Sequence, residues 1–276
     1  MKKIFLFFLF FLVIGSSVFF ILRQKDEFIK SSAQYLPVEK LNKIIVETRT
    51  KIEENHEDIF AYIDGGIALY QKGRDCYPEA INQFNIARKL GAVDIRNFFY
   101  LAIMYDELNL SEKAFSYYEK FLRNRPQDFY IRLRYGNLFF RLNRCQSASE
   151  QYETALLIEP KNQTALINLA LSYKARDMYD EALEKFKLAE EIKLPLPAEI
   201  LIKIAETYRI KKDFTSAEIY YKKAIEKKPD SAAALFGLSE TYLSINKKSE
   251  AKDYFQKVLE IEPNNLEAKK YISKLK

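Results

Sequence analysis

The sequence has 276 residues, of which 44 are basic and 38 acidic, and 48% are hydrophobic. Three of the basic residues, Lys2, Lys3 and Arg23, lie in a segment without acids, so the rest of the chain is nearly neutral. It lacks the basic stripe of a nucleic-acid-binding protein. A single histidine leaves a zinc site short of ligands. Composition therefore argues against nucleic-acid binding and against a resident metal.

The chain begins with a long apolar segment, Ile4 to Leu22, which contains nineteen residues and no charge. As a helix it would be ~28 Å long, close to the thickness of the hydrocarbon core of a bilayer. We predict an uncleaved signal anchor, a transmembrane helix, over residues 1–23. A cleaved signal peptide is the alternative, but the only small residues, Gly15 to Ser17, are followed by five more apolar residues.

Flanking charge gives the expected orientation of this anchor. Two basic residues stand on each side of the apolar segment, so the positive-inside rule alone does not decide. The signal-like N-terminus favours a cytoplasmic N-terminus. The remainder of the chain is then expected on the far side of the membrane, in a periplasm or another extracytoplasmic space.

Residues 24–58 are expected to form a tether and a capping helix. The helix is predicted over Pro37 to Glu53, where Val38, Leu41 and Ile45 fall on one side. Two placements are open: a cap on the elements that follow, or a helix lying on the membrane surface. The mixture of Glu and Lys on its polar side argues against strong attraction to acidic lipid.

From residue 59 onward the sequence repeats about every 34 residues. One column contains Ala114, Ala148, Ala182, Ala217 and Ala251, at intervals of 34, 34, 35 and 34. Four residues after each alanine stands an aromatic residue: Tyr118, Tyr152, Phe186, Tyr221 and Phe255. Another column holds the small residues Ala102, Gly136, Ala170, Ala205 and Ser239. Such a period predicts stacked helix–turn–helix units, in which small residues let helices approach and aromatic residues fill the space beside them.

Local signals place the boundaries of six units. Prolines such as Pro126 and Pro160 end the second helix of a unit, and Asp128, Asn162 and Asp230 stand where the next helix needs its N-cap. The units are predicted at residues 59–94, 95–128, 129–162, 163–197, 198–231 and 232–265, followed by a capping helix over 266–276. Two units depart from the pattern. The first contains Gly65 and Gly66, and the third has Arg132 where a large apolar residue is expected.

This pattern resembles the tetratricopeptide repeat. One unit reads Leu201, Ile204, Ala205, Tyr208, Ala217, Tyr221, Ala224 and Pro229, in the order of that family's signature columns. The resemblance implies an all-α fold, a right-handed α-solenoid of six units, preceded here by one N-terminal transmembrane helix. With the anchor, the chain resembles bacterial membrane-anchored proteins of this family.

In this family the first helices of successive units line a concave groove that holds a segment of a partner. The resemblance carries the groove onto Phe60, Ile63, Tyr70, Phe99, Ile103, Tyr130, Leu133, Asn137, Phe140, Ile167, Leu171, Ile202, Glu206, Arg209 and Phe236. Some of these positions adjoin the core, so packing against a neighbouring helix is the alternative role. The family's carboxylate clamp is not expected, because only Asn137 matches it, and Leu171, Glu206 and Glu240 stand at the equivalent positions.

No residue is predicted to be catalytic, and no cofactor or metal is expected. His56 lies in a polar turn without companion ligands, and Cys76 and Cys145 fall in turns two units apart and are expected to be free thiols. The predicted function is a non-enzymatic, membrane-anchored scaffold that binds a protein or peptide partner and no nucleic acid. The alternative is a self-assembling structural protein of the cell envelope that oligomerises through its array or cap helices.

Overall fold

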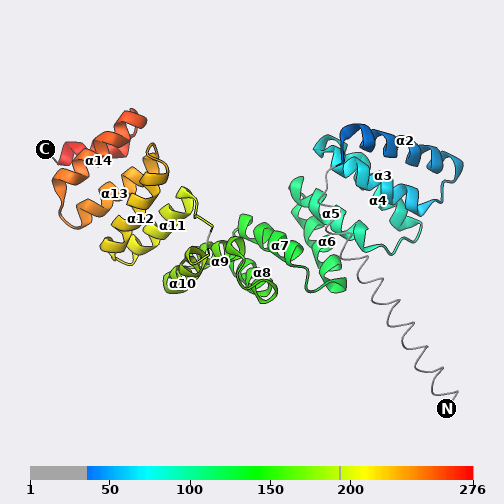
Figure 1. Cartoon of the computed structure of the whole chain (residues 1–276), viewed down its shortest axis with the longest axis horizontal. Helices are drawn as coiled ribbons and strands as arrows, with labels where there is room; N and C mark the ends of the chain where they lie inside the picture. The colour runs from blue at the N-terminus through cyan, green and yellow to red at the C-terminus, as the bar shows by residue number, and fades with distance from the viewer. Residues whose placement is uncertain (1–35, 193, 276) are drawn as a thin grey trace, which may run out of the picture. The chain divides into compact units, whose positions relative to one another are not determined.

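A computed structural model describes residues 36–192 and 194–275, and every regular element in these ranges is a helix (Figure 1). The predicted anchor over residues 1–23 and the tether that follows it lie outside the described residues. Among the helices that are described, none has both the length and the apolar character needed to cross a bilayer.

Between a first helix, α2, and a last helix, α15, the helices follow one another in pairs, from α3 and α4 to α13 and α14. They are α2 (Val38–Glu54), α3 (Ile59–Lys72), the short 3-10 helix η1 (Arg74–Cys76), α4 (Tyr77–Lys89), α5 (Ile95–Glu107), α6 (Ser111–Asn124), α7 (Phe129–Arg141), α8 (Cys145–Ile158), α9 (Gln163–Ala175), α10 (Tyr179–Glu190), α11 (Ala198–Ile210), α12 (Phe214–Lys227), α13 (Ala232–Ser244), α14 (Lys248–Ile261) and α15 (Leu266–Lys274). They divide into two compact units. The N-terminal unit ends at Ala114 and the C-terminal unit begins at Phe115, inside α6.

Most first helices of a pair have a side-chain N-cap. Asp128 Oδ1 accepts a hydrogen bond from the Ile131 amide at 2.9 Å, and Asn162 caps α9 in the same way. The cap predicted at Asp230 is wrong, since Ser231 Oγ accepts from the Ala234 amide at 3.3 Å and caps α13. Asp230 and Ser231 are both good cap formers, and the backbone of Ser231 adopts the extended conformation that a cap requires.

The turns between paired helices share one backbone conformation. Five residues before each alanine of the repeating column, the chain adopts the left-handed region, with φ between 57° and 61°, at Asn109, Asn143, Asp177, Lys212 and Asn246. Asn and Asp tolerate this conformation better than most residues because their short polar side chains hydrogen-bond locally. Asn or Asp at four of the five positions is therefore a sequence signal for the turn, with Lys212 as the exception.

The column residues form the core. The aromatic side chains Tyr118, Tyr152, Phe186, Tyr221 and Phe255 are fully buried, and so are the alanines that precede them. In the C-terminal unit, one apolar cluster extends from Leu166 to Ala268. It includes Leu196, which lies in the linker between α10 and α11. Second helices pack against the first helix of the next unit, as α8 does on α9 and α12 on α13. Stacking therefore covers the apolar faces that a single unit cannot bury.

At the start of the N-terminal unit, α2 packs against α3 and buries Leu41, Ile45 and Thr48. A Cβ atom added at Gly65 would lie 2.4 Å from Gln83 Oε1 and 2.9 Å from Thr48 Oγ1. The glycine that interrupts the repeat pattern thus leaves room for side chains from α2 and α4. On the apolar side of α2, Leu41 and Ile45 are covered by protein, whereas Val38 remains 55% exposed.

Candidate functional site

In the C-terminal unit the first helices form one continuous layer, because α7 contacts α9, α9 contacts α11, and α11 contacts α13. The predicted groove residues of this unit are carried by these four helices. The predicted groove residues of the N-terminal unit are carried by α3 and α5, which also contact each other.

Most of the predicted groove residues of the N-terminal unit belong to its core. Ile63, Phe99 and Ile103 are buried. The Tyr70 ring packs against the rings of Tyr77 and Tyr100, with centroids 5.6 and 4.9 Å apart. Phe60 alone among the five is open to solvent, with 69% of its surface exposed. Packing, the alternative role foreseen for such positions, therefore accounts for the three buried residues.

The predicted groove residues of the C-terminal unit are more accessible. Tyr130 is 42% exposed and Asn137 is exposed. Leu133, Phe140, Ile167, Leu171 and Phe236 are half-buried beside the core clusters. Ile202 is buried. An aromatic and aliphatic surface is therefore open along α7 and α9.

Polar pairs connect each first helix of this layer to the next. Asn168 Nδ2 on α9 donates to Asn137 Oδ1 on α7 at 2.9 Å. Lys174 Nζ on α9 lies 2.6 Å from Glu206 Oε2 on α11. Arg209 Nη2 on α11 lies 3.3 Å from Glu240 Oε2 on α13. The charged groove residues Glu206 and Arg209 thus already have partners within the chain.

The electrostatics of these acids differ. Burial by itself raises the pKa of Glu206, but hydrogen bonds donated by Lys174 and Lys203 bring that pKa below its usual value. Burial also raises the pKa of Glu240, and the charge of Arg209 only partly opposes the rise, so this pKa stays above its usual value. At neutral pH the charged side chains of α11 are compensated by partners on α9 and α13. The aromatic side chains of α7 are therefore more available for an apolar partner.

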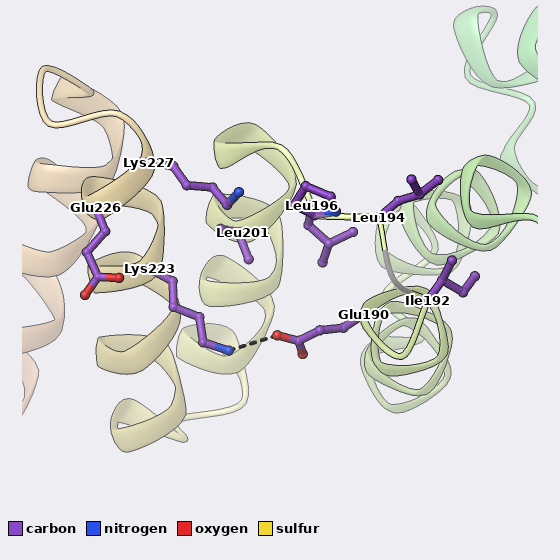
Figure 2. A pocket seen from close by; sticks show the side chains of 9 residues that line it. Glu190, Ile192, Leu194, Leu196, Leu201, Lys223, Glu226 and Lys227 are labelled. Carbon is purple, nitrogen blue, oxygen red and sulfur yellow. Dashed lines mark hydrogen bonds and ion pairs between the residues drawn. The ribbon is translucent and has the colours of Figure 1, made fainter.

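A separate pocket of about 360 Å³ lies between α10, α11, α12 and the linker before α11 (Figure 2). Glu190 points toward Lys223 across it, with 2.8 Å between Oε1 and Nζ, and Tyr220 donates its hydroxyl to Glu190 Oε2 at 2.5 Å. In four other units the column of Glu190 is apolar, with Leu122, Leu156, Ile225 and Leu259, and in the first unit it holds Arg88. An acid in a mostly apolar column is a sequence signal for this pocket, which the predicted groove does not include.

Within residues 36–192 and 194–275, no group of three or more His, Cys, Asp and Glu side chains is placed to hold a metal ion. His56 Nδ1 lies 2.6 Å from the Ile52 carbonyl oxygen at the end of α2. Cys76 and Cys145 are both free thiols.

Paired helices, covered faces and a layer of first helices define a helical-repeat protein. Family profiles described as tetratricopeptide repeat match residues 96–128, 133–197, 174–232 and 209–275. The chain belongs to the tetratricopeptide repeat family. A comparison with curated protein sequences found no match.

Solved structures share the fold. PilF of Pseudomonas aeruginosa is 17% identical, with a TM-score of 0.60 over 78% of this chain and 97% of that one. PilW, described as a type IV pilus biogenesis factor, is 18% identical, with a TM-score of 0.60 over 77% and 97%. MamA of Desulfovibrio magneticus RS-1 is 16% identical, with a TM-score of 0.59 over 63% and 98%. At these identities the likeness concerns the fold alone.

Proposed function

We propose that this chain is a non-enzymatic scaffold that binds a segment of a partner protein along the first-helix layer of its C-terminal unit. The observation that carries the proposal is the surface of Tyr130, Leu133, Phe140 and Leu171, which leaves aromatic and aliphatic side chains accessible on α7 and α9. Aromatic residues of this kind commonly anchor protein interfaces. Family membership supports the proposal, because tetratricopeptide repeat proteins generally mediate protein–protein interaction.

The same surface carries groups suited to an extended segment. Asn137 Oδ1 accepts hydrogen bonds from Tyr152 Oη at 2.8 Å and from Asn168 Nδ2 at 2.9 Å, which hold the Asn137 side chain in place. Its amide Nδ2 remains available as a donor at the exposed face. A main-chain carbonyl of the partner can accept from this group, while apolar side chains of the partner cover Tyr130 and Phe140.

We also propose that residues 1–23 anchor the chain in a membrane, with the N-terminus in the cytoplasm and the repeats on the other side. The length and apolar character of Ile4 to Leu22 support this proposal. An anchored scaffold would bind partners of the cell envelope.

Changing Tyr130 and Phe140 together to serine is expected to weaken partner binding by about 30-fold, since truncated aromatic anchors commonly cost ~2 kcal/mol or more. The full chain, solubilised from membranes, captures partners after cross-linking, and quantitative mass spectrometry compares the variant with wild type. Binding constants are then measured with the purified captured protein. Circular dichroism and the thermal midpoint verify that the variant keeps its helices.

The matched control changes Leu157 and Leu188 to serine. These exposed leucines lie on the second helices α8 and α10, outside the first-helix layer. Capture must persist in this control. Equal capture by both double variants would reject the proposed surface, and a fall in the protein's own oligomeric mass in light scattering with the Tyr130 and Phe140 variant would identify the surface as a self-association site.

Deleting residues 2–23 is expected to move the chain from the membrane fraction to the supernatant, because no other segment is proposed to hold it there. Fractionation after an alkaline carbonate wash measures the change, and protease protection in intact cells reports the side of the repeats. The intact mass of the extracted wild-type protein should include residues 2–23. A mature chain that starts near Ser17 or Val18 would establish the cleaved signal peptide instead.

A further inference from the structure

Arg132 places a cation in a column that other units fill with apolar side chains. It is the fourth residue of the third unit, and the equivalent residues are Tyr62, Phe98, Leu166, Leu201 and Leu235. The three leucines of this column are buried in the core. Arg132 is half-buried, so a guanidinium stands where the repeat pattern expects part of the apolar interface.

The hydrogen bonds of Arg132 fix its side chain but leave its charge uncompensated. Its Nε donates to the Pro126 carbonyl oxygen at 2.7 Å and its Nη1 donates to Gln151 Oε1 at 3.0 Å, both neutral acceptors. In the part of the chain that the structure describes, no carboxylate lies within ion-pair distance of Arg132. Burial accordingly lowers its pKa, although an arginine stays charged. A guanidinium has five N–H groups, so three remain for a ligand.

Arg132 lines an open pocket of about 520 Å³. The pocket is formed by Glu119, Leu122 and Arg123 of α6, Arg132 and Tyr135 of α7, and Gln151 of α8. Arg123 is exposed and also has no carboxylate partner among the described residues. Glu119 is the single acid of the lining, and its Oε1 accepts a hydrogen bond from the Tyr135 hydroxyl at 3.3 Å. The lining therefore carries two cations against one acid, and none of its residues belongs to the predicted groove.

We propose that this pocket binds a carboxylate group of an acidic side chain on the partner protein, with Arg132 as its main ligand. The remaining N–H groups of the guanidinium form a planar fork that can donate two parallel hydrogen bonds to one carboxylate. Pro126 and Gln151 already hold the fork in place, so little side-chain freedom is lost on binding. That the carboxylate belongs to a partner protein rests on the proposed function. That the pocket binds an anion does not depend on that function.

The probe is the peptide acetyl-Ala-Glu-Glu-Ala-amide, titrated into the purified full chain at constant ionic strength. Its matched control is the same peptide with glutamine in place of glutamate, and inorganic phosphate forms a third arm. The glutamate peptide is expected to bind wild type at least about tenfold more tightly than Arg132→Leu. The glutamine peptide is expected to show no difference between the two proteins.

Arg132→Leu is a suitable variant because leucine occupies the same column in three other units. Its thermal midpoint without peptide is expected to equal or exceed that of wild type, since a half-buried cation without a counter-charge is removed. Glu119→Gln, which removes the acid from the lining, is expected to tighten peptide binding roughly twofold to fivefold. Opposite changes from these two substitutions are not expected of a purely structural role.

Equal affinity of wild type and Arg132→Leu for the glutamate peptide would overturn the site. An Arg132-dependent response to phosphate alone would overturn the carboxylate assignment. These titrations need no partner, so their outcome is independent of the capture experiment. Equal capture by both double variants, together with Arg132-dependent binding of the glutamate peptide, would reject the proposed groove and leave this site standing.

Discussion

Phe186→Ala is expected to lower the free energy of unfolding of the C-terminal unit by about 3–5 kcal/mol, the usual cost of removing a fully buried aromatic side chain. The Phe186 side chain is 1% exposed and belongs to the continuous cluster of that unit. In a stacked array each unit depends on its neighbours, so the interfaces of α10 with α9 and α11 should weaken together. Urea unfolding followed by circular dichroism measures the change.

Phe60→Ala is the control for this substitution, since it makes the same chemical change at a side chain with 69% of its surface exposed. Its cost is expected to stay within about 0.5 kcal/mol, as for most surface substitutions. Similar costs for the two variants would contradict the placement of the aromatic column in the core.

Gly136→Leu is expected to destabilise the chain by about 1–3 kcal/mol through overpacking. A Cβ atom at Gly136 would lie 2.5 Å from Cε1 of Tyr152, whose ring is fully buried. Tyr152 must move to make room for the leucine, and this movement would weaken or break its hydrogen bond to Asn137. Thermal and urea unfolding should both report the loss, even though leucine has a higher helix propensity than glycine.

A double-mutant cycle with Tyr152→Ala tests the cause of that loss. Removing the ring opens the space that the leucine needs, so Gly136→Leu is expected to cost less in the Tyr152→Ala background than in wild type. Equal costs in the two backgrounds would show that Gly136 and Tyr152 do not compete for the same space, and the predicted register of the small and aromatic columns would then be wrong.

Features that depend on neighbours in the sequence were predictable. Helix pairs follow from the spacing of alanine and aromatic residues, because residues three and four apart share one face of a helix. The caps at Asp128 and Asn162 are equally local, and so is the left-handed turn residue five positions before each column alanine. The choice between Asp230 and Ser231 failed because two adjacent residues offer the same capping chemistry.

The candidate site was predicted less completely, because core and groove positions show the same apolar character in the sequence. Ile63, Phe99 and Ile202 share one column with Leu133 and Ile167, yet the first three are buried and the last two are half-buried. Their exposure depends on how closely the neighbouring helices approach. That distance is a property of packing between units and not of spacing within one.

The family, the helix pairs and the buried aromatic column could be predicted from the sequence, since with a period of about 34 residues the units must stack to cover their apolar faces. Which charged side chains form ion pairs depends on the tertiary structure. Lys174 pairs with Glu206 and Arg209 with Glu240, each across about one repeat of sequence. Arg132, by contrast, donates to two neutral oxygens and pairs with no acid among the described residues. Ion pairs depend on side chains brought together from different helices, and that geometry arises only when the units stack.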